Sequence, residues 1–242
     1  VLRCEISRVN IERAVDAILA RVRSGNGGYV CFTNVHASVM AYNNPEYLTV
    51  LNQSFLTLPD GKPVYWVGRL NGMNDIQQIP GPDFLPILMG CNIVPPLRHY
   101  FYGGRSDVLE NLIENLKAKF PDIVIAGWES PPYRDLSADE DSQMVRRIKE
   151  SAASIIWVGL GAPKQEYWMA SHFEQLKPAV LLGVGAAFDF HAGNVRRAPS
   201  WMRTIGLEWL YRLAQEPRRL WKRYLVTNTL FVVYVFKSLF LK

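Results

Sequence analysis

Short apolar runs alternate with amphipathic segments along most of the chain. Apolar residues have helical spacing over 9–19, where Asn10 is a suitable N-cap, and a second helix is predicted over about 107–120. Buried strands are predicted at the apolar runs 29–32, 99–102, 123–126, 155–158 and 179–184. Strands that alternate with helices of roughly 10–15 residues predict βαβ units. We therefore expect an α/β fold with a mostly parallel sheet flanked by helices.

The segments that follow these strands are rich in glycine. In open α/β sheets, ligands bind beyond the carboxyl ends of the strands, so these segments form one predicted binding edge. Glycine lets backbone N–H groups approach a ligand closely, and a helix N-terminus attracts anions. The edge is therefore suited to phosphate, and its members are Thr33-Asn34, Gly103–Arg105, Gly127-Trp128, Gly159–Gln165 and Gly185–Asp189.

The segment from Gly159 to Lys164, GLGAPK, is similar to a dinucleotide fingerprint but departs from it at the third glycine, where Lys164 stands. No GxxxxGK[ST] string occurs either, so an NAD site and a nucleotide-sugar dehydrogenase are both disfavoured. We expect Gly159 and Gly161 to clear the strand exit for a ligand. Lys164 and Gln165 could contact a phosphate or a base, although spacing alone fits an ordinary strand-to-helix turn equally well.

The positive charge of the chain lies in its last fifth. Residues 196–242 carry ten basic and two acidic residues, a net charge of +8, whereas residues 1–195 carry −3. A block of this kind suits an anionic surface or a phosphate-bearing ligand. We therefore expect an α/β domain over 1–195, to which the resemblance described below assigns catalysis and UDP-sugar binding, and a basic, aromatic appendage over 196–242.

Three cysteines, Cys4, Cys31 and Cys91, are too few and too widely spaced for a disulfide framework or a zinc site, so we expect buried thiols. The first residues do not resemble a signal peptide, which makes a cytoplasmic location the expectation.

Metal binding and nucleophilic catalysis have weaker support in the sequence. Asp139-Glu140-Asp141 spells the DxD of many metal-dependent glycosyltransferases, but Ser137 and Glu140 have capping-box spacing, which favours a helix start. The four histidines lack metal-site spacing, and no nucleophile elbow is present. We expect no metal and no cofactor.

Asp60 lies in LPDG, between an apolar segment and Gly61. An Asp-Gly pair is most often a simple turn. Burial beside Leu56, Leu58 and Val64 would instead raise the pKa of the Asp60 carboxyl group, as a general base for a sugar hydroxyl requires. The sequence leaves both interpretations open.

The stretch 225–236 is apolar except for Thr-Asn-Thr, and it is shorter than the roughly 18–20 residues that span a bilayer. Its basic flanks suit the interface of an anionic membrane. A last helix or strand packed on the core is the alternative. Trp201, Trp209 and Tyr211 alternate with leucines at the spacing of a core-packing helix face, so we expect no nucleic-acid partner.

Several stretches together resemble the WecG/TagA/CpsF glycosyltransferases and occur in the order found in that family. They cover nearly the whole chain: FTNVHASVM (32–40), LPDGKPVYWVGRL (58–70), YFYGGRSDVLENL (100–112), VGLGAPKQEYWM (158–169) and GVGAAFDFHAGNVRRAPSWMRTIGLEWLYRLAQEPRRLWKRYL (183–225).

The resemblance implies a Rossmann-like, metal-independent inverting enzyme that moves a hexose from a UDP-sugar to a sugar on a polyprenyl-diphosphate carrier. The hexose would be N-acetylmannosamine, its uronic acid or glucose. It implies Asp60 as the catalytic base with Thr33 as its partner, and an appendage that closes over the diphosphate at the cytoplasmic face of the membrane. The further substrate-binding residues that we expect are Asn34, Gln78, Gly103, Gly104, Gly161, Lys164, Gln165, Asp189, Arg197, Arg212, Arg219 and Lys222. Protomers could assemble into a homo-oligomer.

One position departs from the family pattern. Gln78 stands where the family usually has an arginine, so the site loses a positive charge near phosphate or sugar. A neutral sugar fits that loss better than a uronic acid does. The alternative function is a non-catalytic module that binds membranes or polyanions through the +8 tail.

Overall fold

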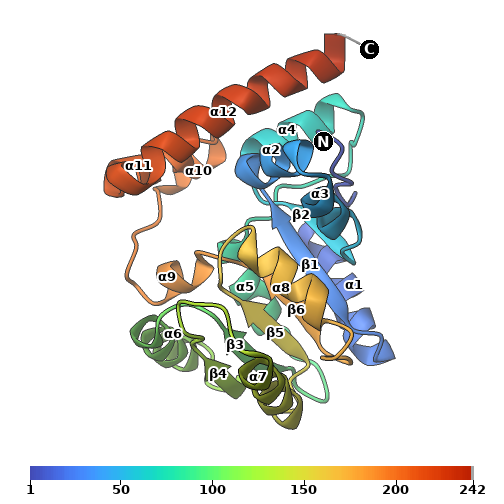
Figure 1. Cartoon of the computed structure of the whole chain (residues 1–242), viewed down its shortest axis with the longest axis vertical. Coiled ribbons are helices and arrows are strands. Elements are labelled where there is room, and N and C mark those ends of the chain that lie inside the picture. The colour runs from blue at the N-terminus through green and yellow to red at the C-terminus, as the bar shows by residue number, and fades with distance from the viewer. Residues whose placement is uncertain (241–242) are drawn as a thin grey trace. The chain divides into compact units, whose positions relative to one another are not determined.

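The computed structural model describes residues 1–240, and its central element is a six-stranded sheet (Figure 1). The strand order is β2-β1-β6-β5-β3-β4, and β1 with β6, β6 with β5, β5 with β3 and β3 with β4 all pair in parallel. This confirms the predicted parallel α/β fold. The strands are β1 (Gly28–Thr33), β2 (Leu56–Pro59), β3 (Arg98–Tyr102), β4 (Val124–Glu129), β5 (Ile155–Val158) and β6 (Val180–Gly183).

β5 lies between β6 and β3 and is buried along its whole length. A strand covered on both faces reads as a continuous apolar run, which is why Ile155–Val158 could be located from the sequence alone. Its register places Ile155 opposite Val180 of β6 and opposite His99 of β3.

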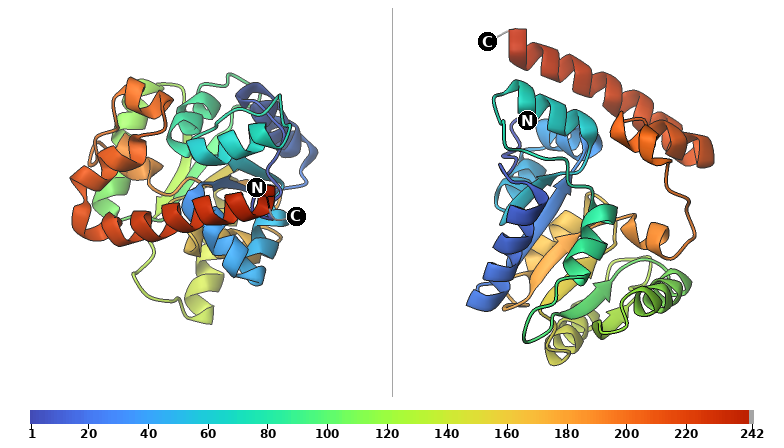
Figure 2. Two further views of the ribbon diagram at one scale, coloured as in Figure 1. Left: turned by 90° about the horizontal axis from the view of Figure 1, so that it is seen from above. Right: turned by 180° about the vertical axis from the view of Figure 1, so that it is seen from behind.

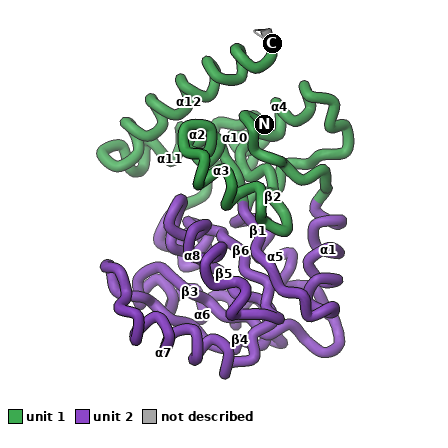
Figure 3. Tube along the Cα trace, turned by 45° about the vertical axis from the view of Figure 1, so that its right-hand side comes forward, with its two compact units in different colours: residues 1–10, 32–80, 196–242 green, residues 11–31, 81–195 purple. Residues whose placement is uncertain are grey.

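The chain forms two compact units (Figure 3). Unit 1 comprises 1–10, 32–80 and 196–242, and unit 2 comprises 11–31 and 81–195. The basic C-terminal segment therefore belongs to the same unit as Asp60. A separate role for 1–195 as the catalytic domain stays a prediction.

Helices cover both faces of the sheet in unit 2. In Figures 1 and 2, α8 lies on one face, and α1 and α5 lie on the other.

The capping box predicted for α7 is confirmed, because Glu140 N donates to Ser137 Oγ at 3.3 Å and Ser137 N donates to Glu140 Oε2 at 2.8 Å. The helices of this unit are α1 (Ile11–Ser24), α5 (Gly81–Met89), α6 (Ser106–Lys119), α7 (Ala138–Glu150), α8 (Lys164–His172) and α9 (Ala187–His191).

In unit 1, the long C-terminal helix α12 packs along α2 (Figures 1 and 2). Tyr42 stacks on Tyr234 with ring centroids 4.2 Å apart, and the Tyr234 hydroxyl donates to Asn43 Oδ1 at 3.0 Å. The helices of this unit are α2 (Val35–Asn43), α3 (Pro45–Asn52), α4 (Lys62–Leu70), α10 (Ser200–Thr204), α11 (Glu208–Gln215) and α12 (Pro217–Phe240).

The prediction of a core-packing helix face around Trp201 to Leu213 is wrong. This segment forms two short helices, α10 and α11, and neither buries a residue. The break falls near Gly206, whose φ of +80° favours glycine and whose added Cβ would come within 3.1 Å of Lys62 and Trp66. Leucine spacing alone could not reveal this interruption.

The alternative of a packed helix is confirmed in part for the apolar C-terminal stretch, and membrane contact stays a prediction. Leu220, Thr227 and Phe231 of α12 are buried, as expected of a packed helix. The rest of α12 leaves an exposed apolar set, Leu225, Val226, Val232, Val233 and Phe236. Among the described residues, no helix combines the length and the hydropathy that a bilayer crossing requires. Residues 241–242 of the appendage lie outside the described part.

The cysteine prediction holds for two of the three thiols. Cys4 and Cys31 are buried thiols, whereas Cys91 is half-buried.

Candidate active site

The loop that carries Asp60 is tied into unit 1 by backbone hydrogen bonds. Asp60 directly follows β2, and its N–H donates to the carbonyl of Thr33 at the end of β1, at 3.0 Å. Its carbonyl accepts from Gln78 Nε2 at 2.9 Å. The next residue after Gln78 continues the link, since Ile79 N donates to Pro59 O at 2.8 Å. The backbone on which the half-buried carboxylate sits is therefore fixed on both sides.

Asn34 connects this carboxylate to helix α2. As the N-cap residue, Asn34 accepts from Ala37 N through Oδ1 at 3.1 Å, and it donates from Nδ2 to Asp60 Oδ2 at 3.4 Å. Because the amide oxygen caps the helix, the amide nitrogen is left to face the carboxylate. Gly61 makes the approach possible, since an added Cβ would lie 3.3 Å from the Cα of Asn34.

Thr33, the predicted partner of Asp60, is fully buried. Its backbone carbonyl reaches Asp60, but its side-chain Oγ1 has no hydrogen-bond partner among the described residues. Buried hydroxyl groups are rarely left without a partner, so this hydroxyl, on a residue bonded to Asp60 through the backbone, is a candidate to hold a polar atom of a ligand.

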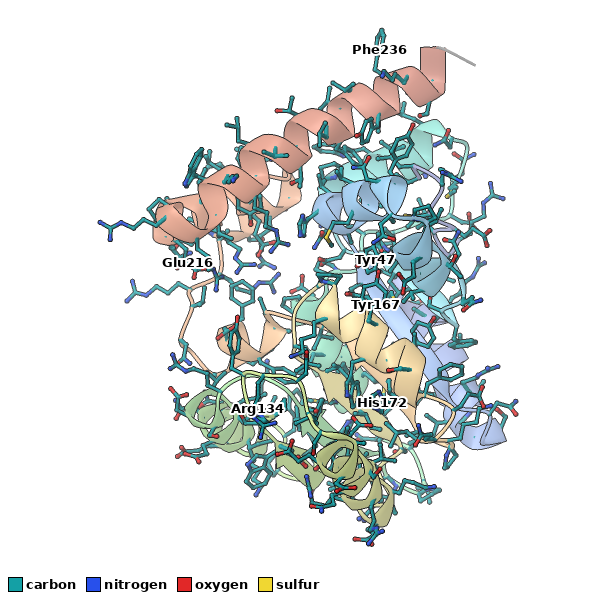
Figure 4. The ribbon with its side chains drawn as sticks, in the orientation of Figure 1. Tyr47, Arg134, Tyr167, His172, Glu216 and Phe236 are labelled. Carbon is teal, nitrogen blue, oxygen red and sulfur yellow. The ribbon has the colours of Figure 1, made fainter. Side chains whose placement is uncertain are left out.

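The predicted arginines of the appendage are organised by two glutamates. Arg197 Nε lies 3.5 Å from Glu208 Oε1. Arg212 and Arg219 both pair with Glu216, labelled in Figure 4, at 3.6 and 2.7 Å. Glu216 ends α11 and precedes α12, so it brings together two arginines from consecutive helices.

Lys222 and Arg223 differ in a way that the sequence did not reveal. Lys222 is exposed, whereas Arg223 is half-buried and its Nε is buried without a hydrogen-bond partner among the described residues. Burial lowers the pKa of Arg223, and the charges of Arg212 and Arg219 lower it further. Spacing could not distinguish the two residues, because positions three and four beyond Arg219 share a helix face with it.

His36, in the first turn of α2, was also missed as a site residue. Its Nδ1 is buried and has no partner in the described chain. Burial lowers the pKa of His36 to about 4, with the Arg223 charge as a second cause, so the imidazole is neutral near pH 7. The sequence signal was its position two residues after Asn34.

In unit 2, the exits of β3 and β5 meet as predicted. A Cβ on Gly103, where φ is +110°, would lie 2.7 Å from the carbonyl carbon of Gly159. A Cβ on Gly159 would itself meet the Phe188 ring at 2.4 Å, so packing alone accounts for this glycine. Gly161, by contrast, has a φ of +77° and open space where a Cβ would stand. Gly104 is also left-handed, and its carbonyl accepts from Ser130 Oγ at 2.6 Å.

Gln165 forms part of the scaffold at these exits. Its buried amide donates from Nε2 to Gly183 O at 2.9 Å and to Glu166 Oε1 at 2.8 Å, and its Oε1 accepts from Gly161 N at 3.1 Å. Both amide hydrogens are thus used inside the protein. The Gln165 side chain fixes the Gly161 loop, through its amide oxygen, to the end of β6, through its amide nitrogen. Lys164, at the start of α8, is exposed.

Asp189 lies in α9, half-buried, close enough to Arg105 to affect its electrostatics. The pKa of Arg105 is raised mainly by its hydrogen bond to Asp107, with Asp189 a smaller cause. Arg105 follows Gly104 at the end of β3, so an exposed guanidinium, hydrogen-bonded to Asp107, lies near the residue predicted to meet the uridine.

The DxD segment has a structural explanation. Asp139 and Glu140 belong to the first turn of α7, and His172 Nε2 lies 3.0 Å from Asp141 Oδ1. Among residues 1–240, no group of three or more His, Cys, Asp or Glu side chains is arranged to hold a metal ion.

Comparison with known proteins places this geometry in a family. The sequence model of the glycosyl transferase WecG/TagA/CpsF family matches residues 1–242, and the chain belongs to this family. The resemblance seen in the sequence is thereby confirmed.

The chain is similar to enzymes described as N-acetylglucosaminyldiphosphoundecaprenol N-acetyl-beta-D-mannosaminyltransferase. It is 33% identical to that of Bacillus subtilis over 199 residues, which is 82% of this chain and 75% of the relative. The Bacillus spizizenii relative is 34% identical with the same coverage. The Staphylococcus aureus (strain MW2) relative is 29% identical over 201 residues, 83% of this chain and 76% of the relative.

Proposed function

We propose that this protein is an inverting hexosyltransferase that moves a sugar from a UDP-sugar to a sugar on a polyprenyl-diphosphate carrier, in the synthesis of a surface polysaccharide or wall polymer. The observation that carries the proposal is the Asp60 carboxylate, to which Asn34 Nδ2 donates, on a residue whose backbone N–H is bonded to Thr33. The names of the relatives support the carrier-linked acceptor.

In this proposal Asp60 acts as the general base. Its carboxylate takes the proton of the acceptor hydroxyl, the oxygen attacks the anomeric carbon from the face opposite the nucleotide, and UDP leaves with its bonding electron pair. One displacement of this kind inverts the anomeric configuration. The Asn34 amide orients the carboxylate, and a positioned base of this type contributes roughly 10²–10⁴-fold in rate.

The departing diphosphate needs positive charge. We assign that role to Arg212 and Arg219, which Glu216 holds together, with Arg197 and Lys222 as further cations of the same segment. Transfer would then need no metal ion. Activity that is unchanged by a chelator supports this assignment, and activity that a chelator abolishes and Mg²⁺ restores would contradict it.

The nucleotide is assigned to unit 2. The left-handed glycines 103, 104 and 161 lie at neighbouring strand exits, and Asp189 and Lys164 supply polar contacts there. The N–H groups of Gly103 and Gly161 are bonded to Glu129 O and Gln165 Oε1, so these two glycines shape the exits rather than donate to the ligand. Gln165 contributes by fixing the Gly161 loop. N-acetylmannosamine is the first sugar to test because the relatives are named for it. Gln78 donates to backbone, and its neutral side chain agrees with a neutral sugar.

We further propose that the protein works peripherally on the inner face of an anionic membrane, where its lipid-linked acceptor would be. The basic flank and the exposed apolar residues of α12 support this.

The experiment that tests the function is a panel of UDP-sugars incubated with a short-chain lipid-diphosphate N-acetylglucosamine, with product detected by mass spectrometry. UDP should also raise the melting temperature by mass action. A chain that shows neither transfer nor a UDP-induced shift, yet still binds anionic vesicles, would instead be the non-catalytic binding module.

A further inference from the structure

We propose that His36 of α2 and Arg223 of α12 form a subsite for a phosphate group of the lipid-linked acceptor. This inference rests on the proposed function and adds to it a separate place for the acceptor's diphosphate. The arginines assigned to the nucleotide, Arg212 and Arg219, are not part of the subsite.

The first observation concerns two buried nitrogens on α2 and α12, helices that pack against each other. His36 Nδ1 and Arg223 Nε each have no hydrogen-bond partner among the described residues. Leaving a buried polar atom without a partner destabilises the folded protein, so two such atoms on packed helices need an explanation. A phosphate oxygen accepts hydrogen bonds from both groups and would supply the missing partner.

The second observation is an excess of like charge around Arg223. The charges of Arg212 and Arg219 act against the protonated form of Arg223, and that of Arg223 acts against protonation of His36. Glu216 pairs with Arg212 and Arg219. A bound anion would relieve the repulsion at Arg223, whose cationic form is otherwise disfavoured by burial.

The order of residues along α12 indicates which phosphate binds. Arg223 follows Lys222 on α12 and is the last basic residue before the exposed apolar residues Leu225, Val226, Val232, Val233 and Phe236. Figure 4 shows Phe236 projecting from the outer side of the helix. A polyprenyl diphosphate likewise has charged phosphates joined to a hydrocarbon chain. Arg223 lies at the boundary between the basic and the apolar part of α12, where the phosphates of such a lipid would meet its hydrocarbon chain.

His36 places the subsite on α2, whose N-cap residue Asn34 donates a hydrogen bond to the proposed general base, Asp60. It lies two residues after Asn34, which donates to Asp60. A phosphate held at the first turn of α2 would therefore anchor the acceptor through the same helix end that orients the carboxylate. Arg223 and His36 are binding residues here, and neither takes part in the proton transfer.

The test compares two acceptors in the full-length protein. One is N-acetylglucosamine on a short lipid diphosphate, and the other is an alkyl N-acetylglucosaminide of equal chain length without phosphate. Wild type should use the diphosphate acceptor with the higher kcat/KM. Arg223→Gln and His36→Ala should each lose that preference by roughly ten- to a hundredfold through acceptor KM, while the donor KM stays unchanged. Arg218→Gln, an exposed arginine on the same helix, is the matched control.

Three results would overturn the subsite. Equal losses on both acceptors would mean that Arg223 and His36 do not recognise phosphate. A parallel rise in the donor KM, or in the Kd for UDP, would assign the phosphate to the nucleotide. A loss seen only with vesicles of anionic lipid, and not with detergent-dispersed acceptor, would assign it to a lipid headgroup.

Folding and function are separated by further measurements. Arg223→Lys keeps a cation while removing Nε, so it should lose part of the preference even if Arg223→Gln folds poorly. If wild type transfers no sugar, the proposed function fails, and calorimetric binding of the diphosphate acceptor still decides the subsite. Binding that is weakened in Arg223→Gln and unchanged in Arg218→Gln supports it, and equal binding by all three proteins refutes it.

Discussion

Asn34 Nδ2 donates to Asp60 Oδ2 at 3.4 Å while Asn34 Oδ1 accepts from the Ala37 N–H, so one side-chain amide both starts α2 and orients the carboxylate. The two roles can be separated by substitution. Aspartate keeps the cap acceptor but loses the donor and adds a second negative charge, whereas alanine loses both functions.

Asn34→Asp should therefore remain close to wild type in melting temperature and lose up to about a hundredfold in kcat. The acidic limb of its pH–rate profile should move to higher pH, because two neighbouring carboxylates oppose each other's ionisation. Asn34→Ala should lose rate and also about 1 kcal/mol of unfolding free energy. Unaltered kinetics in Asn34→Asp would show that the hydrogen bond does not serve the reaction.

Gln78 is predicted to support Asp60 through the backbone. Gln78→Ala removes the donor to the Asp60 carbonyl, so kcat should fall while the affinity for UDP is retained, and stability should drop by about 1 kcal/mol. Gln78→Arg restores a donor and the family's usual residue, and it should recover most of the rate. A fall in UDP affinity in Gln78→Ala, with kcat unchanged, would identify a nucleotide contact instead.

Gly159 is predicted to serve packing. Gly159→Ala places a Cβ 2.4 Å from the Phe188 ring and should destabilise the protein by about 1–3 kcal/mol in chemical denaturation. Combining it with Phe188→Leu should recover part of the loss, since the smaller side chain yields space. A double variant no more stable than the sum of both single losses would refute this explanation.

His99 makes stability depend on pH. It is buried in β3, its Nδ1 accepts from Trp157 Nε1 at 3.1 Å, and burial lowers its pKa from 6.5 to about 4. The unfolded chain therefore binds the proton more readily, so stability should fall as the pH drops from about 6.5 to about 4, by at most roughly 3 kcal/mol.

Denaturation curves across this range should show a weaker pH dependence in His99→Gln. His36 contributes in the same window, because its pKa is also lowered to about 4, so the dependence should shrink without disappearing. Identical slopes in wild type and His99→Gln would contradict the assignment.

The exposed apolar residues of α12 should contact lipid. Replacing Val232, Val233 and Phe236 by serine should reduce sedimentation with anionic vesicles, and salt should weaken the binding that remains. Leu70, an exposed leucine at the end of α4, provides the control as Leu70→Ser. An unchanged bound fraction in the triple variant would assign this surface another purpose.

The fold could be predicted from the sequence wherever burial leaves a continuous signal. β5 is apolar throughout because it is covered on both faces, and the capping box of α7 is a purely local interaction. The order β2-β1-β6-β5-β3-β4 could not be predicted, because it depends on pairing between distant segments. The helices α10 and α11 escaped prediction because a spacing typical of burial falls on exposed residues there.

Only some residues of the candidate site could be predicted from the sequence. Asp60 and Asn34 were marked by sequence, and the structure joins them. Gln165 was expected at a ligand, but its amide hydrogens are used on Gly183 and Glu166. Arg223 was passed over for Lys222, since only tertiary packing decides which of two adjacent basic side chains turns inward.

The most direct test of the central claim is the turnover of Asp60→Asn, measured with a UDP-sugar and the lipid-diphosphate acceptor alongside UDP affinity by calorimetry. The account predicts that kcat falls by roughly 10²–10⁴-fold while the Kd for UDP stays close to that of wild type. Turnover that survives the substitution would show that another group takes the acceptor's proton.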